Sequence, residues 1–362
     1  MFKNLIAAAL FAAGALAPNT SAAQTAATTT PLKVAFVYVT PVGQAGWTFQ
    51  HDIGRKDMER ALGAAVQTTV VEDVPEGPDA ERVMRDLASQ GHQLIFATSF
   101  GYLEPALRVA AEFPGVRIEH AGGYKTATNL NTYNVRAYEA RWLAGKLAAQ
   151  NSKRGVAGYV AGFPVPEVVQ GINAFALGMR SVNPKATVRV VWLNAWFDPA
   201  RERDAALALV NQGADVLANH TASPAVATVA EEKKVRLIAN QSDMSAFAPK
   251  AQLAAVTPRW GGYYTQVARD VIAGRWKVAP VWGGLRSGMV NLTAIDARLP
   301  ARQTKALEAA RRALSDGRSA IFSGPLVDQT GRTRLDKGTL DDAAIAQMDW
   351  LVQGVIGSPP TQ

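Results

Sequence analysis

The chain has 362 residues, of which 48% are hydrophobic and 19% charged, a composition typical of a folded globular protein rather than a disordered one. That length exceeds what one hydrophobic core usually organises, so two α/β domains are expected. The formal net charge is +8, but basic and acidic residues alternate, most densely at residues 201–204. This pattern indicates solvated helix faces rather than a nucleic-acid-binding surface. The absence of cysteine excludes disulfides, cysteine nucleophiles, thiolate metal sites and the acylated cysteine of a lipoprotein.

The N-terminus has the pattern of a secretory signal peptide. Lys3 precedes an apolar run over residues 5–17, and a group of small residues ends at Ala23. The run is too short to span a bilayer, and a buried N-terminal helix is the alternative explanation. We therefore expect a signal peptide over residues 1–23, a flexible tether over residues 24–31 and a periplasmic mature protein. No later segment is apolar enough over a sufficient length to predict a transmembrane helix.

Near-continuous apolar runs of strand length recur along the chain, and such runs are typical of strands buried on both faces of a parallel sheet. They lie at residues 33–39, 68–71, 94–97, 116–119, 156–160, 188–193, 216–218, 235–239, 254–256 and 289–293. Segments of helical period separate most of them, including residues 79–89, 138–149 and 200–210. Strands that alternate with helices predict right-handed βαβ units, and hence an α/β fold with doubly wound parallel sheets.

The predicted strands are too many for one ordinary sheet, so we expect two lobes joined by a multi-strand hinge. A break falls at residues 151–155, and the Gly- and Pro-rich residues 280–288 predict a return crossing. The expected parts are an N-terminal lobe of residues 32–152 plus about 285–320, a C-terminal lobe of residues 153–284 and a C-terminal extension of residues 321–362. Such lobes place a cleft between the carboxyl ends of two sheets, where open α/β sheets bind ligands.

Aromatic residues follow the predicted strands at four places. Trp47 follows the first strand, Phe100 and Tyr102 follow the third, and Phe163 and Trp196 follow strands of the second half. One such residue is usually packed in a core or a loop. Four places divided between both halves favour a cleft that holds a flat ring by stacking. These five residues are therefore candidates for ligand binding.

A flat ring also needs hydrogen-bonding groups at its edge. Asp243 lies after a predicted strand and is the carboxylate we expect in this role, whereas capping of a following helical turn explains it equally well. Asn219 and His220 follow another predicted strand and are further candidates. Asp198, which precedes Pro199, is expected to cap the next helix instead.

The sequence predicts neither a catalytic site nor a metal site. The four histidines have no i,i+4 partner and no metal-ligand spacing. No phosphate-binding glycine loop follows the first strand, and Ser99 lies in only a vague likeness of a nucleophile elbow, without a base. We therefore expect no enzyme activity, no catalytic residue, no metal and no cofactor.

Five blocks occur in an order and spacing that are informative together. They are residues 47–54, which begin Trp-Thr-Phe-Gln; 138–145, Tyr-Glu-Ala-Arg-Trp-Leu-Ala-Gly; 171–178, with Val-Asn-Pro soon after; 196–199, Trp-Phe-Asp-Pro; and 213–216, Gly-Ala-Asp-Val. With these blocks, the chain resembles the basic membrane protein (BMP) family of ABC-transporter solute receptors, which includes purine-nucleoside receptors. The resemblance covers most of residues 33 to about 292 and implies a fold like the type I periplasmic binding proteins. It also implies that Trp47 and Trp196 take the places of the family's stacking Phe residues, and that Asp243 takes the place of its late-strand Asp.

The resemblance implies a monomeric periplasmic receptor that delivers a small molecule to an ABC permease in the inner membrane. The family's Asp pair before the first stacking residue is replaced here by Gly43 and Gln44, and indoles replace phenyl rings. We therefore expect a purine base such as adenine in preference to a nucleoside. A periplasmic sensor and a nucleoside-processing enzyme on the same fold are the alternatives.

Overall fold

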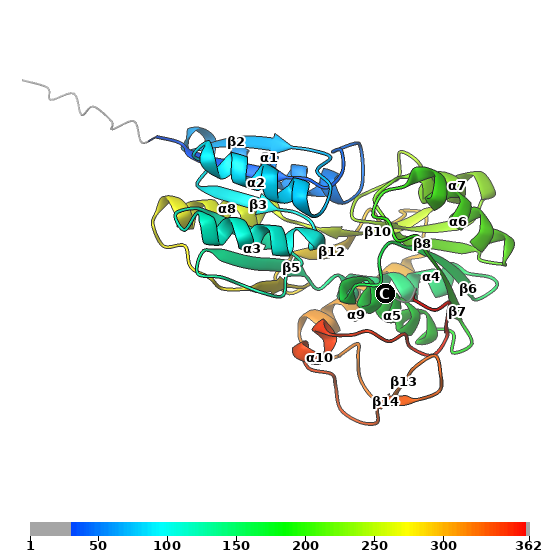
Figure 1. Cartoon of the computed structure of the whole chain (residues 1–362). Coiled ribbons are helices and arrows are strands. Elements are labelled where there is room, and N and C mark those ends of the chain that lie inside the picture. Colours follow the sequence, from blue (N-terminus) through cyan, green and yellow to red (C-terminus); the bar gives the residue numbers. More distant parts are fainter. Residues whose placement is uncertain (1–29, 360–362) are drawn as a thin grey trace, which may run out of the picture. The chain divides into compact units, whose positions relative to one another are not determined.

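The computed structural model describes residues 30–359. The predicted signal peptide lies outside the described residues, as does most of the predicted tether. The described chain forms two α/β lobes, each built on one large sheet (Figure 1). We call them the first and the second lobe. They confirm the predicted α/β class and its doubly wound parallel sheets.

The first lobe is built on six parallel strands in the order β11-β5-β4-β3-β1-β2. They are β1 (Leu32–Val37), β2 (Val66–Val71), β3 (Leu94–Ala97), β4 (Arg117–Ala121), β5 (Leu130–Val135) and β11 (Val281–Gly283). The side chains of β1 are apolar toward both faces because helices cover both faces. Phe36 belongs to the core on one side of the sheet, and its neighbours Ala35 and Val37 belong to the core on the other.

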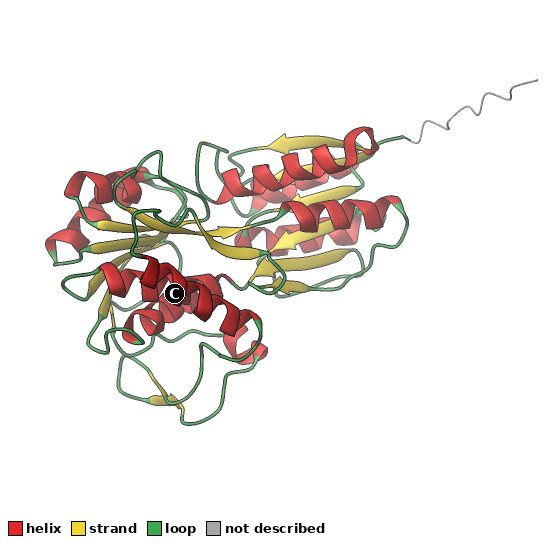
Figure 2. Cartoon of the chain, turned by 180° about the vertical axis from the view of Figure 1, so that it is seen from behind, coloured by secondary structure: helices red, strands yellow, loops and turns green. Residues whose placement is uncertain are grey.

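Two pairs of helices cover this sheet. Their bounds are α1 (Trp47–Leu62) and α8 (Gly261–Ile272) on one face, and α2 (Pro78–Ser89) and α3 (Leu103–Glu112) on the other. Short 3-10 segments, η1 (Gly63–Ala65) and η2 (Phe100–Tyr102), connect elements of this lobe. Figure 2 shows helices on both sides of the strands, as the doubly wound prediction requires.

The second lobe is built on seven strands in the order β12-β10-β9-β8-β6-β7-β15, and only β12 runs antiparallel to its neighbour among the paired strands described. The strands are β6 (Val156–Ala161), β7 (Thr187–Trp192), β8 (Val216–His220), β9 (Arg236–Asn240), β10 (Gln252–Pro258), β12 (Val290–Thr293) and β15 (Val355–Ile356). Its helices are α4 (Ala137–Asn151), α5 (Pro166–Arg180), α6 (Pro199–Asn211), α7 (Ala225–Lys233) and α9 (Ala301–Ser315). The Asp198 side chain caps α6 by accepting from the Arg201 amide at 3.0 Å, as predicted.

The boundary between the lobes differs from the prediction. The chain changes lobes three times, between β5 and α4, between β10 and α8, and between β11 and β12. Helix α4, expected in the N-terminal lobe, packs on α5 instead, because Gly145 and Gly178 let the two backbones touch. A Cβ at either glycine would lie 2.1 Å from a backbone oxygen of the other helix.

The later segments are also placed differently from the expected boundaries. Helix α8 and strand β11, expected in the C-terminal lobe, belong to the first lobe, and residues 290–315 belong to the second. The polar residues 151–155 that suggested a domain break form a turn within the second lobe, where the Asp215 carboxylate accepts from the amides of Lys153 and Arg154. A polar turn looks the same in sequence whether it joins two lobes or two elements of one.

The C-terminal extension lies against the second lobe (Figure 1). It contains β13 (Leu326–Val327), β14 (Thr333–Leu335) and α10 (Asp342–Ala346), and its last strand, β15, pairs with the outer edge of β7. In the side chain of Asn173 on α5, Nδ2 donates to the Trp350 carbonyl at 2.7 Å, and Oδ1 accepts from the Val352 backbone amide at 2.9 Å. The extension therefore covers a sheet edge that would otherwise present unpaired backbone groups.

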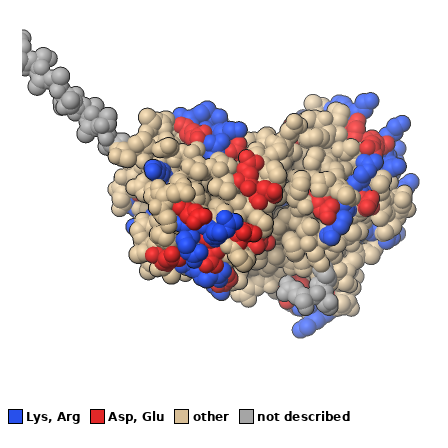
Figure 3. Space-filling view, turned by 45° about the horizontal axis from the view of Figure 1, so that its top comes forward, with Lys and Arg blue, Asp and Glu red and all other residues tan. Residues whose placement is uncertain are grey.

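On the face shown in Figure 3, Lys and Arg lie close to Asp and Glu rather than in one basic region. Arg85, for example, contacts the carboxylates of both Glu81 and Glu112 at 2.7 Å. Within residues 30–359, no helix combines the length and apolar character needed to cross a membrane.

Candidate functional site: the pocket between the lobes

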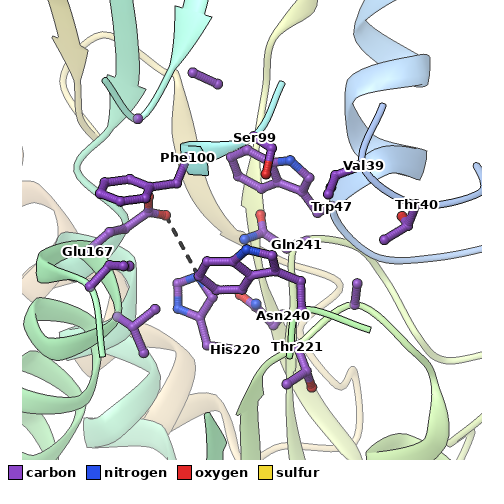
Figure 4. A pocket seen from close by; sticks show the side chains of 16 residues that line it. Val39, Thr40, Trp47, Ser99, Phe100, Glu167, His220, Thr221, Asn240 and Gln241 are labelled. Carbon is purple, nitrogen blue, oxygen red and sulfur yellow. Dashed lines mark ion pairs between the residues drawn. The ribbon is translucent and has the colours of Figure 1, made fainter. Parts of the chain in front are cut away.

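A pocket lies where the carboxyl ends of the strands of both lobes meet. It contains about 590 Å³ of space outside the protein atoms, counting the solvent at its open side. The first lobe contributes Val39, Thr40, Trp47, Ser99, Phe100, Ala121 and Gly122, and the second contributes Val165, Glu167, Val168, Trp196, His220, Thr221, Ala222, Asn240 and Gln241. Figure 4 shows how side chains from the two lobes face one another across this space.

Trp47, the first residue of α1, lines the pocket from the first lobe. Its indole N–H donates to the Thr98 carbonyl at 2.6 Å, which fixes the plane of the ring. Behind it the imidazole of His51 lies edge-on at 4.3 Å between ring centroids, and the buried Trp260 ring lies 5.8 Å away. The ring is therefore held rigidly by buried neighbours while part of it stays open to the pocket.

Trp196 lines the pocket from the second lobe, on the loop between β7 and α6. Its ring passes so close to Gly162 that a Cβ there would lie 2.8 Å from the indole. Phe163 is not among the lining residues. Its ring packs against Trp196 at 4.9 Å between centroids and supports it from behind.

Of the two aromatic residues expected after β3, the structure brings only Phe100 to the pocket. Tyr102 is fully buried in the core of the first lobe, where its hydroxyl donates to the Val74 carbonyl at 2.5 Å. The reason is the 3-10 turn over Phe100–Tyr102, which points these two side chains in different directions. Tyr102 is thus a core residue, and its expected place in the cleft is wrong.

Glu167 is the carboxylate of the pocket, and sequence reasoning missed it. It is the second residue of α5, directly after Pro166, and its side chain is 20% exposed. Its Oε2 atom accepts from the Nδ2 of Asn134, on β5 of the first lobe, at 3.1 Å. Burial raises the pKa of Glu167, and the Arg141 guanidinium opposes that rise. The Pro-Glu pair at a helix start was the available signal, but it occurs at many helices that bind nothing.

His220 lines the pocket opposite Glu167, at the end of β8 (Figure 4). Burial lowers the pKa of His220 to about 3, so its imidazole is neutral at neutral pH. Its Nδ1 atom has no hydrogen-bond partner among residues 30–359. Asn219, which was expected beside it, is buried outside the lining, and its Nδ2 donates to the Thr221 carbonyl at 3.1 Å.

Asp243 does not line the pocket. It is exposed, and its Oδ1 accepts from the Ser245 amide at 2.9 Å and from Gln252 at 2.7 Å. The capping explanation is therefore the one that fits, because the carboxylate closes a local turn. The polar groups that this segment offers the pocket are Asn240, the last residue of β9, and Gln241, which follows it; both precede Asp243 in the chain. Asn240 ends β9 just as His220 ends β8, so the reasoning from strand ends that selected His220 would also have selected Asn240.

The two lobes touch beside the pocket. The amide of Gly46 donates to Ser242 Oγ at 2.7 Å, and a Cβ at Gly46 would lie 2.2 Å from the Ala222 carbonyl oxygen. At a second contact between the lobes, the side-chain amide of Asn134 in the first lobe donates to the Glu167 carboxylate in the second lobe. Gly43 and Gln44 are exposed and do not line the pocket.

The arrangement of these groups suits binding. Rings from both lobes can enclose a flat ligand, and the carboxylate, imidazole and amides can contact its edge. Within the part of the chain that the structure describes, no cluster of three or more His, Asp or Glu side chains could hold a metal ion.

Comparison with known proteins confirms the resemblance found in the sequence. The family model described as "ABC transporter substrate-binding protein PnrA-like" matches residues 32–317. The chain is 46% identical over 325 residues to a purine-binding protein of Brucella abortus (strain 2308), covering 90% of this chain and 93% of that one. It is 33% identical over 330 residues to a Haloferax volcanii protein named as an ABC transporter glucose-binding protein, and the match covers 91% of this chain and 82% of that one.

Solved structures share the fold. An ABC transporter solute-binding protein from Conexibacter woesei matches with a TM-score of 0.66 at 20% identity, covering 80% of this chain and 98% of that one. A solute-binding protein from Aeropyrum pernix K1 matches with a TM-score of 0.67 at 17% identity, and the match covers 80% of this chain and 92% of that one. With the family match and the two-lobed pocket, the conclusion is that the chain belongs to the Bmp family of PnrA-like ABC transporter substrate-binding proteins.

Proposed function

We propose that this protein binds a purine base, such as adenine, in the pocket between its lobes and delivers it unaltered to an ABC permease. The observation that supports this most directly is the composition of the pocket wall. Trp47 and Phe100 from one lobe and Trp196 from the other line the same space, together with one half-buried carboxylate, Glu167.

A purine fits this wall because it is flat and apolar on its faces and polar at its edge. Each ring that stacks on the ligand contributes roughly 0.5–1.5 kcal/mol beyond the burial of area. Trp47 and Trp196 are both held in place by neighbouring rings, so little side-chain entropy is lost on binding. The name of the Brucella abortus relative, a purine-binding protein, supports the same class of ligand.

The edge of a purine carries N–H donors beside ring-nitrogen acceptors. The Glu167 carboxylate and the unpartnered Nδ1 of a neutral His220 can accept, and the Asn240 amide can donate. A carboxylate this enclosed is tolerated when donors surround it, and Asn134 supplies only one. The ligand would supply a second hydrogen-bond donor to the Glu167 carboxylate.

The preference for a free base over a nucleoside is supported by the sequence resemblance, in which Gly43 and Gln44 take the places of an Asp pair, and by the indole rings that line the pocket. A ribose would need its own hydrogen-bonding partners, because each hydroxyl buried without one costs about 1–3 kcal/mol. The exposed Gly43 and Gln44 lie outside the lining and offer it none.

Isothermal titration of ligand-free protein tests the proposal. The protein is unfolded, dialysed and refolded, and is then titrated with adenine, guanine, hypoxanthine, adenosine, guanosine and D-glucose. We expect a free purine base to bind more tightly than its nucleoside, and glucose not to bind. Equal or tighter binding of the nucleosides would refute the size preference, and binding of glucose alone would refute the ligand class.

The receptor role itself is tested by transport. Cells that lack this protein should lose uptake of the radiolabelled base, and uptake should return with the full-length chain. Growth on the base without any transport defect would point to the sensor alternative. Conversion of adenosine by the purified protein would point to the enzyme alternative.

A further inference from the structure

Arg141 is a buried cation that does not line the pocket. It lies on α4 with no exposed surface, and its guanidinium carbon is 5.3 Å from the centre of the Tyr159 ring. Its Nη2 donates to the Asn219 carbonyl at 2.8 Å and to Oδ1 of Asn240. Its Nε and Nη1 atoms have no partner among the described residues. Burying a guanidinium with three of its five N–H donors unpaired is costly, so stability alone does not account for it.

The contact with Asn240 fixes which way the amide of that residue points. A guanidinium has donors and no acceptor, so it can pair only with the Oδ1 atom of the amide. Turning the amide over would place two N–H donors against each other. Asn240 is buried and lines the pocket, and its Nδ2 has no partner within residues 30–359 (Figure 4). An unpaired buried donor of this kind is expensive unless a ligand accepts from it.

The charge of Arg141 also acts on the other polar groups of the pocket. It opposes the rise that burial causes in the pKa of Glu167, and it adds to the lowering that burial causes in the pKa of His220. The first effect favours the ionised form of Glu167, which accepts hydrogen bonds, and the second favours the neutral imidazole of His220. One side chain outside the pocket therefore influences three polar residues that line it.

We propose that Arg141 is a positioning residue that holds Asn240 as a hydrogen-bond donor, and that this donor reads an acceptor nitrogen in the ring of the bound purine. The inference rests on the proposed function and adds to it the group on the ligand that is recognised. It predicts that binding depends on one ring nitrogen and that this dependence passes through Asn240.

The experiment compares adenine with 1-deazaadenine, 3-deazaadenine and 7-deazaadenine, each of which replaces one acceptor nitrogen by C–H. Wild-type protein should bind one of the three about tenfold or more weakly than adenine. Asn240→Asp keeps the shape and the contact with Arg141 but replaces the donor by an acceptor. In this variant adenine should bind about tenfold more weakly, and the difference between adenine and the sensitive analogue should shrink to within about threefold.

Arg141→Met should reduce adenine affinity about tenfold and lower the same discrimination, because no donor then holds the Oδ1 atom of Asn240. Arg141→Lys, which keeps the positive charge and an N–H donor group, should restore part of the affinity.

Three results would overturn the inference while the proposed function stands. They are equal binding of adenine and all three analogues, unchanged discrimination in Asn240→Asp, and a loss of apo stability in Arg141→Met with an equal affinity loss for every analogue. If wild-type protein binds none of the purines, the proposed function itself fails.

Discussion

The Nε2 atom of His220 lies 3.7 Å from Oε1 of Glu167, across one side of the pocket. That distance is too long for a hydrogen bond. Because burial lowers the pKa of His220 to about 3, the imidazole is neutral and the two groups are not an ion pair at neutral pH. The carboxylate therefore keeps acceptor capacity for a ligand.

Glu167→Gln should weaken adenine binding about tenfold or more. The substitution keeps the shape of the side chain but turns one carboxylate oxygen into an N–H donor, which then faces the donors of the ligand. Isothermal titration measures the change. Asp243→Asn is the matched control, because it makes the same chemical change at a carboxylate that closes a local turn outside the pocket. Its affinity should stay within about twofold of wild type, and a larger loss there than in Glu167→Gln would return Asp243 to the site.

Trp47→Ala and Trp196→Ala should each weaken binding by roughly 1–3 kcal/mol, through lost burial and lost stacking. Purine binding to the wild-type protein should also quench tryptophan fluorescence, and each variant should show a smaller change. Trp142→Ala is the control, because this residue is half-buried on α4 and does not line the pocket. Unchanged affinity in both pocket variants would exclude the site.

Gly46→Ala should prevent the lobes from meeting around the ligand. Its new Cβ would overlap the Ala222 carbonyl oxygen of the other lobe, so the contact seen here could not form. We expect affinity to fall at least about tenfold, and small-angle scattering should show that the variant stays expanded when adenine is added.

Gly77→Ala separates this effect from backbone strain. Gly77 also precedes a helix at a positive φ, +97° against +94° at Gly46, but nothing lies within 4 Å of the position that its Cβ would take. Both substitutions therefore strain the backbone to a similar degree, and only Gly46→Ala obstructs the other lobe. Similar affinities in the two variants would show that contact at Gly46 is not needed for binding.

Buried histidines should make the fold sensitive to acid. His120 is fully buried, and burial lowers its pKa to about 3 from an ordinary value of 6.5. The unfolded chain therefore binds a proton that the folded chain refuses. The contribution of His120 to stability is complete above pH 6.5 and is lost as the pH falls toward 3.

His120→Gln measures that contribution. Between about pH 6 and pH 4 the free energy of unfolding of the wild type should fall more steeply than that of the variant, by about 1.4 kcal/mol per pH unit. Urea unfolding at several pH values gives both curves. If the free energies of unfolding of wild type and variant change in parallel with pH, His120 takes up its proton without unfolding of the protein.

Much of the architecture could be predicted because it is determined locally. Apolar runs such as that of β1 and the capped helix after Asp198 are properties of a few neighbouring residues. The rule that side chains at strand ends face the cleft selected Trp47, Phe100, Trp196 and His220, and all four line the pocket. Strand β5 was missed because its Asn and Thr side chains are polar, although most of them are buried.

The membership of the lobes could not be predicted, because it depends on contacts between distant segments. The close approach of α4 and α5 at Gly145 and Gly178 decides that α4 belongs to the second lobe. Neither helix carries a local sign of its partner, and a glycine within a helix is usually only a weak point.

The sequence by itself determined the class of the fold, the family and the aromatic character of the pocket, since these depend on local pattern and on the order of motifs. Only the tertiary structure decided which polar groups line the pocket. Glu167 enters the pocket because Asn134 of the other lobe lies beside it, and Asp243 stays outside because its own loop satisfies it. The side chain of a loop residue points toward whichever donors surround it, and those donors come from segments far away in the chain.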